Sequence, residues 1–214
     1  YYFNSYGVNV MMFEMLPHLV PREDEEVSFE LERQFGRQGI EFALAASVSG
    51  VEKKNGRLAV QYELGGEKQE FVCDKVLLGV GVQPNTDGIG IEDLGIKTVG
   101  PGFIEVDGNM RTNVGGVYAV GDVNGKLQLA HVAFDQGVVA AETIAGHEAT
   151  PIDDYTNMPR CTYCQPQIAS IGLTEAEARE QGINVKVGKV PFAVAGKSVA
   201  IGESQGFAKL LIDD

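Results

Sequence analysis

The sequence has few basic residues and no long apolar run. Seventeen Lys and Arg stand against 30 Asp and Glu, which gives a formal net charge of −13. Such a surface repels phosphate backbones and anionic headgroups, so we expect no nucleic-acid partner. The longest apolar run, Val76 to Val82, is far shorter than the roughly 20 residues that cross a bilayer. We therefore expect no membrane span and no membrane partner.

Cysteine is also scarce. Three cysteines do not make the disulfide framework of a small secreted domain, and we recognise no secretory signal. A reducing, cytoplasmic location is favoured. Cys161-Thr-Tyr-Cys164 has the C-x-x-C spacing of a redox pair or of half a zinc site, but the only other cysteine is the distant Cys73. We expect two reduced thiols and no metal, with the redox and zinc alternatives left open.

The two ends of the chain lack the features of complete domains. There is no initiator Met, and Tyr1 to Gly7 is typical of the end of a helix that stops at a glycine. Residues 206–214 predict a strand with nothing after it to pair with or cover it. At 214 residues and 44% hydrophobic, the chain is still long enough for a sizeable core. We expect an internal segment of a longer protein.

The hydrophobic pattern predicts half of a doubly wound α/β domain with an inserted β-meander. Residues 76–80 show no alternation, which is typical of a strand covered on both faces. Thr174 and Glu177 form a capping box. The expected elements are a strand at 8–13, a helix that begins at 22–26 and stops at Gly39, a strand at 40–48, a strand at 58–64 between the turns Asn55-Gly56 and Gly65-Gly66, buried strands at 76–80 and 117–120, a helix that begins at 129–131, a strand at 166–172 and a helix closed by Gly182.

Glu14 follows the first of these strands. In a doubly wound domain, an acid at the end of the second strand commonly accepts hydrogen bonds from the ribose of an adenine dinucleotide. The G-x-G-x-x-G loop that accompanies it would lie before residue 1. An exposed Glu at a strand end is also commonplace, so Glu14 alone does not establish a nucleotide site.

Three motifs in a fixed order give a more specific indication. They are Gly79-Val-Gly-Val-Gln-Pro-Asn-Thr86, Thr112-Asn-Val-Gly-Gly-Val-Tyr-Ala-Val-Gly-Asp122 and Leu129-Ala-His131. Together they resemble the flavoprotein disulfide reductases, or pyridine nucleotide-disulfide oxidoreductases, and most closely the dihydrolipoamide dehydrogenases among them. The resemblance covers essentially the whole chain. It implies the C-terminal part of an NAD-binding domain at 1–86, the second part of an FAD-binding domain at 87–158 and the beginning of an α+β dimerisation domain at 159–214.

The resemblance also implies two cofactor sites. Asp122 would accept a hydrogen bond from the ribityl chain of FAD, with Gly121 letting the backbone pass close to the ligand. The segment that opens the following helix would lie against the isoalloxazine, where the positive helix end stabilises reduced flavin. The implied FAD residues are Gly121, Asp122, Gln128, Leu129, Ala130 and His131, and the implied NAD residues are Glu14, Val48 and Gly81.

Structural alternatives stand beside several of these assignments. Asp122 could cap a helix or a turn. His131 could be a histidine whose ring is hydrogen-bonded within a packed helix start, and Val48 could be a core residue of a strand. For His131 we expect contact through packing and backbone without acid–base chemistry. No Arg near Glu14 is placed to hold a 2′-phosphate, so NAD is preferred over NADP.

By the same resemblance, the full-length protein would oxidise dihydrolipoamide and pass electrons through a disulfide and FAD to NAD⁺. It would be a homodimer, with lipoyl domains of 2-oxoacid dehydrogenase complexes as partners. The family's redox disulfide and His-Glu base lie outside these residues, so no catalytic residue is assigned and the segment alone would be inactive. The alternatives are another disulfide reductase, of the mercuric or glutathione reductase kind, and a non-catalytic nucleotide-binding or dimerisation segment.

Overall fold

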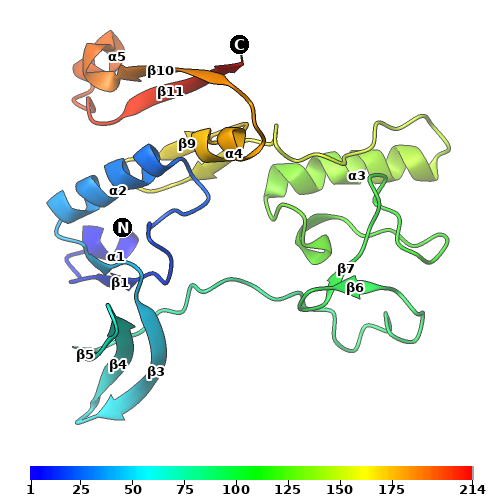
Figure 1. Cartoon of the computed structure of the whole chain (residues 1–214). Helices are drawn as coiled ribbons and strands as arrows, with labels where there is room; N and C mark the ends of the chain where they lie inside the picture. Colours follow the sequence, from blue (N-terminus) through cyan, green and yellow to red (C-terminus); the bar gives the residue numbers. More distant parts are fainter. Residues whose placement is uncertain (214) are drawn as a thin grey trace. The chain divides into compact units, whose positions relative to one another are not determined.

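The computed structural model describes residues 1–213, which form two compact units (Figure 1). The first unit combines residues 1–78 with the chain from residue 161 onward, and the second consists of residues 79–160. Helices and strands occur in both, and the expected mixed α/β fold class is confirmed. The three predicted domain ranges, 1–86, 87–158 and 159–214, stay predictions.

The first unit begins with a small parallel sheet and a helix. Its elements up to residue 73 are α1 (Tyr2–Ser5), β1 (Met11–Phe13), α2 (Glu25–Arg37), β2 (Glu41–Ala43), β3 (Ser47–Lys54), β4 (Arg57–Leu64) and β5 (Glu67–Cys73). β1 and β2 pair in parallel, with Met11 opposite Glu41. The Asp24 side chain accepts a hydrogen bond from the Glu26 amide at the start of α2, and Leu31 and Phe35 are buried on one face. The predicted helix is confirmed.

β3, β4 and β5 form the predicted antiparallel meander. Both residues of the Asn55-Gly56 turn have positive φ, 51° and 79°, and so do both residues of Gly65-Gly66, which suits the turns that match the twist of a hairpin. Phe13 of β1 lies 4.6 Å from the ring of Tyr62 and 5.9 Å from that of Phe71. These ring contacts hold the meander beside the parallel pair.

The strand predicted at 40–48 is divided into β2 and β3. Ala45 has a φ of 51°, outside the extended region, so the strand cannot continue through it. The Ala45 and Ala46 amides donate hydrogen bonds to the carbonyls of Leu16 and Glu14, at 3.0 and 2.9 Å. The chain is therefore held at the loop after β1 before it enters the meander.

The prediction of a buried strand at 76–80 is wrong. This segment has no helix or strand, and Leu77, Leu78 and Val80 are 80%, 76% and 91% exposed. A parallel strand covered on both faces needs hydrogen-bonded neighbours. Among the described residues no strand pairs with this segment, and its apolar side chains stay exposed.

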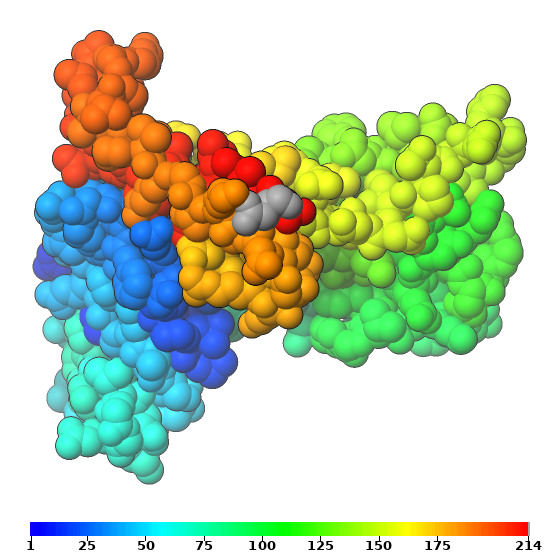
Figure 2. Space-filling view, turned by 45° about the horizontal axis from the view of Figure 1, so that its top comes forward, coloured from blue at the N-terminus to red at the C-terminus, as the bar shows by residue number. Residues whose placement is uncertain are grey.

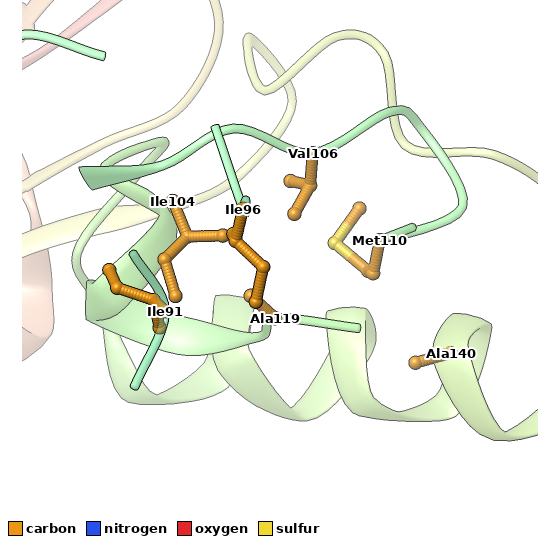
Figure 3. Close-up of a cluster of buried hydrophobic side chains, with 7 residues drawn as sticks. All are labelled: Ile91, Ile96, Ile104, Val106, Met110, Ala119 and Ala140. Carbon is orange, nitrogen blue, oxygen red and sulfur yellow. The ribbon is translucent and has the colours of Figure 1, made fainter. Parts of the chain in front are cut away.

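The second unit packs a long helix against short strands and turns. Its elements are β6 (Thr98–Val99), β7 (Phe103–Ile104), the 3₁₀ helix η1 (Gly121–Asn124) and α3 (Ala130–Ile144). Figure 3 shows its core, in which Ala140 of α3 faces the other buried side chains, Ile91, Ile96, Ile104, Val106, Met110 and Ala119. The strand predicted at 117–120 is wrong, because only Tyr118 pairs, in one isolated bridge with Arg111. Its apolar residues contribute to the core from a turn instead.

The C-terminal part of the first unit contains β8 (Arg160–Thr162), β9 (Ile168–Ser170), α4 (Glu175–Glu180), β10 (Val185–Pro191), the 3₁₀ helix η2 (Phe192–Val194), α5 (Gly196–Ala200) and β11 (Phe207–Asp213). The predicted capping box of Thr174 and Glu177 is present. β11 is the strand predicted at 206–214, and Asp214 lies outside the described residues. Its antiparallel partner, β10, precedes it in the chain, so the predicted strand is present and is paired.

One ionic cluster joins distant parts of the first unit. Lys209 of β11 lies 2.9 Å from carboxylate oxygens of Asp24 and Glu26, at the start of α2, and 2.7 Å from that of Glu175, at the start of α4. Its side chain is 7% exposed. Figure 2 shows the orange segment that precedes β11 beside the blue α2 segment, and Lys189 of β10 in that orange segment lies 2.6 Å from a carboxylate oxygen of Glu26.

Candidate cofactor-binding site

The Gly121-Asp122 turn lies beside the first turn of α3. Gly121 has a φ of 79°, a conformation that L side chains rarely adopt. A Cβ built on Gly121 would lie 3.4 Å from the Cβ of Ala133, so the backbone approaches the helix closely. The Gly121 amide donates a 2.6 Å hydrogen bond to Oε1 of Gln136. The turn and the helix are therefore held together at this point.

The Asp122 carboxylate is exposed and, within residues 1–213, has no hydrogen-bond or ionic partner. The N-cap residues of η1 and α3 are Val120 and Leu129, and neither helix has a side-chain cap. Only the backbone carbonyl of Asp122 is engaged, by the Gly125 amide at 3.1 Å. Asp122 therefore caps neither helix, and its carboxylate is available to a ligand.

The start of α3 also has unused donors. The Ala133 amide bonds to the Leu129 carbonyl at 3.1 Å, which leaves the amides of Ala130, His131 and Val132 without a partner in the described chain. Free amides and the helix dipole make this end electropositive. Gln128 and Ala130 are exposed and Leu129 is half-buried.

One ring nitrogen of His131 contacts the backbone. Nε2 lies 2.8 Å from the carbonyl oxygen of Pro159, a distance at which a protonated Nε2 donates to that oxygen. The imidazole thus ties the helix start to the chain that follows α3, although the residue is exposed. Its backbone amide remains available.

Two buried amide side chains, Asn124 and Gln136, support the turn from inside; we call them the amide pair. They are 3% and 0% exposed, and Asn124 Nδ2 donates to Gln136 Oε1 at 2.9 Å. Gln136 Nε2 donates in turn to the Tyr155 hydroxyl at 3.0 Å. Sequence reasoning missed both residues. A signal was present, because Gln136 shares the buried face of α3 with Val132 and Val139.

The residues predicted for NAD lie in different units. Glu14 follows β1 and accepts a 2.8 Å hydrogen bond from the Leu16 amide through Oε1. Val48, in β3, is 45% exposed, so it is not a core residue. Glu14 and the start of β3 are brought together by the bond from the Ala46 amide to the Glu14 carbonyl. Gly81 belongs to the second unit and has a φ of 109°.

The three cysteines are free thiols. Cys161 is exposed, whereas Cys164 is half-buried and its Sγ donates to the Pro166 carbonyl at 3.0 Å. Burial raises the pKa of the Cys164 thiol above its usual value. Within the described residues no group of three or more His, Cys, Asp or Glu side chains could hold a metal ion. Likewise, no helix of residues 1–213 has the length and apolar character needed to cross a membrane.

Two family models match the chain. Residues 1–137 match the pyridine nucleotide-disulphide oxidoreductase model, and residues 158–214 match the dimerisation domain of the same group. Curated relatives include proteins named dihydrolipoyl dehydrogenase from Mycobacterium leprae, 45% identical over 213 residues, and from Corynebacterium glutamicum, 42% identical over 217 residues. Both alignments cover 100% of this chain.

A solved structure is similar over nearly the whole chain. The HOCl-induced flavoprotein disulfide reductase RclA from Escherichia coli has a TM-score of 0.88 at 26% identity, covering 99% of this chain and 48% of that one. The two curated relatives are likewise covered over 46% of their length. The chain thus spans about half the length of the relatives that it matches.

Proposed function

Because this chain belongs to the pyridine nucleotide-disulphide oxidoreductase family, a group of flavin-dependent oxidoreductases, we propose that it forms about half of a dihydrolipoyl dehydrogenase subunit. The proposed reaction oxidises dihydrolipoamide and reduces NAD⁺. The names of the curated relatives support this reaction. The redox disulfide and the acid–base residues would come from parts of the subunit beyond these residues.

The proposed FAD site consists of Gly121, Asp122 and the segment 128–131. The observation that carries it is the unpaired Asp122 carboxylate beside an uncapped helix start. A carboxylate that only accepts hydrogen bonds suits the hydroxyls of a ribityl chain, and free helix amides suit a ring edge that gains negative charge. Bound flavin would carry electrons between a dithiol and a pyridine nucleotide. Gly121, whose φ is 79°, would let the turn bring its backbone close to the ligand.

The proposed NAD site uses Glu14, Val48 and Gly81. Glu14 Oε1 is held by the Leu16 amide, and the carboxylate can also accept hydrogen bonds from ribose hydroxyls. The same negative charge would repel a 2′-phosphate. The exposed Val48 would face the adenine, and Gly81 would allow the backbone close to the nicotinamide half.

The match of residues 158–214 to a dimerisation domain supports a homodimer. Lipoyl domains of 2-oxoacid dehydrogenase complexes would be its partners, and the cytoplasm its location.

The direct test is to purify the full-length subunit and measure its bound flavin and its activity. We expect about one FAD per subunit, reduction of NAD⁺ by dihydrolipoamide, and much faster flavin reduction by NADH than by NADPH. Glu14→Gln is expected to narrow the difference between the rates at which NADH and NADPH reduce the flavin. Activity with oxidised glutathione or Hg²⁺ in place of the lipoamide couple would instead identify another disulfide reductase. A protein without flavin would contradict the proposal.

A further inference from the structure

We propose that Gln136 is a positioning residue that sets the place of the Asp122 carboxylate relative to the start of α3. The inference rests on the proposed flavin site, because it explains how the Asp122 turn is held there. It assigns no contact between Gln136 and the cofactor. Gln136 would act through Asn124 and through the backbone of Gly121.

The hydrogen bonds of the amide pair bracket Asp122 on both sides in the sequence. On the N-terminal side, Gln136 Oε1 accepts from the Gly121 amide at 2.6 Å, and Asn124 Nδ2 donates to the Ala119 carbonyl at 3.3 Å. On the C-terminal side, Asn124 Oδ1 accepts from the Lys126 amide at 3.1 Å. The backbone of the turn therefore makes three hydrogen bonds with the amide pair. One is made by Gln136 directly, and two are made by Asn124, which donates to Gln136.

A close steric contact adds to these hydrogen bonds. Gly125 ends η1 with a φ of 67°, and a Cβ there would lie 2.5 Å from Cγ of Phe103. The Phe103 ring thus lies directly against the end of the turn, where it would clash with any side chain larger than that of glycine.

The position of Gln136 along α3 makes it suited to this role. It lies six residues after Ala130, which corresponds to about 9 Å along a rigid helix. Through Gln136, the helix that offers the free amides also holds the turn that carries Asp122. Burying an amide without partners is costly, and here both ends of Gln136 are satisfied, by Gly121 and Asn124 at one end and by Tyr155 at the other.

A purely structural role predicts different behaviour from a positioning role. If Gln136 only stabilises the core, its replacement lowers the melting temperature and leaves the FAD affinity of the folded protein unchanged. If it positions Asp122, the affinity falls even where the protein is fully folded. Gln136→Met keeps the side-chain length and removes all of its hydrogen bonds. Ile96→Ala removes core volume in the same unit and removes no hydrogen bond of the amide pair, so it is the control for lost stability.

The experiment titrates FAD into the apoprotein of full-length variants, well below their melting temperatures. We expect Gln136→Met to raise the Kd for FAD roughly tenfold, the effect of losing one good hydrogen bond. Ile96→Ala should lower the melting temperature and leave the Kd near that of the wild type. Gln136→Glu keeps an acceptor for Gly121 and Asn124 and should retain most of the affinity.

A double-mutant cycle shows whether Gln136 acts through Asp122. Once Asp122→Ala has removed the carboxylate, adding Gln136→Met should raise the Kd little further. Additive losses, or an unchanged Kd in Gln136→Met, would overturn the inference while leaving the flavin proposal intact. A wild-type apoprotein that binds no FAD would overturn the proposed function itself, so the two failures are distinguishable.

Discussion

At the scale of single residues, Asp122 differs from Asp24, Asp107 and Asp154, three aspartates whose side chains bind nearby backbone amides. Asp24 accepts from the Glu26 amide, Asp107 from the amides of Asn109 and Arg111, and Asp154 from the amide and hydroxyl of Thr156. These side chains stabilise the local backbone, as aspartates in turns commonly do. Asp122 makes no such bond and lies in a turn packed against the uncapped start of α3, and on these two observations together we assign its carboxylate to a ligand.

Cys161 and Cys164 should differ in reactivity although they are close in sequence. Because burial raises its pKa, the Cys164 thiol forms less thiolate than an ordinary thiol at pH 8, and its proton is already donated to the Pro166 carbonyl. We expect iodoacetamide to modify Cys161 at least about tenfold faster. Timed alkylation followed by mass spectrometry of the peptide 161–179 measures both rates.

The alkylation experiment also tests the redox and metal alternatives. The unfolded protein, in which both thiols should react at similar rates, is the control. Equal rates in the folded protein, a disulfide between Cys161 and Cys164 in a reduced preparation, or stoichiometric zinc would contradict reduced, metal-free thiols.

At the scale of elements, those with local signals could be predicted from the sequence. α2 has acids in its first turn and an apolar face, α4 has a capping box, and the meander has two glycine turns. The strands expected at 76–80 and 117–120 are absent because a strand needs hydrogen-bonded neighbours, and an apolar run does not by itself specify them. The amide pair escaped prediction for a related reason. The hydrogen bond between the two side chains joins residues 12 apart in the sequence, and it depends on how η1 packs on α3.

The same scale includes the ionic cluster at the starts of α2 and α4. Burial alone would lower the pKa of Lys209, but its hydrogen bonds to Glu175, Glu26 and Asp24 outweigh this effect and raise it. We expect Lys209→Met to reduce the free energy of unfolding by about 2 kcal/mol, because it leaves three carboxylates close together without their shared cation. Urea unfolding measures this. Arg57→Met, which removes an exposed pair with Asp74, is the control and should change stability by less than about 0.5 kcal/mol.

The loss of stability caused by Lys209→Met should depend on pH, and it should become smaller in acid. Hydrogen bonds from Lys189 and Lys209 hold the pKa of Glu26 below its usual value. A lowered carboxyl pKa stabilises the fold above the unfolded pKa and ceases to do so as the pH falls through the folded pKa. The difference between wild type and Lys209→Met should thus be constant from about pH 6 to 8 and shrink below about pH 4. A difference that grows in acid would contradict this account of the cluster.

At the scale of the whole molecule, the two units contain different shares of the proposed cofactor residues. All residues proposed for FAD lie in the unit 79–160, whereas those proposed for NAD are divided between the two units. The curated relatives are about twice as long as this chain. The motifs predicted the family, which is confirmed, whereas the cofactor residues stay predictions. The exposure of residues 76–80 could not be predicted from the sequence.

The measurement that most directly tests the central claim is the FAD affinity of Asp122→Ala in the full-length subunit, determined together with its melting temperature. Removing a charge-assisted hydrogen bond costs on the order of 1.5–3 kcal/mol, so we expect the Kd for FAD to rise roughly 10- to 100-fold. The melting temperature of the apoprotein should stay near that of the wild type, because the carboxylate has no protein partner in the described chain. An unchanged Kd with a lower melting temperature would show that Asp122 supports the fold and would contradict the flavin site.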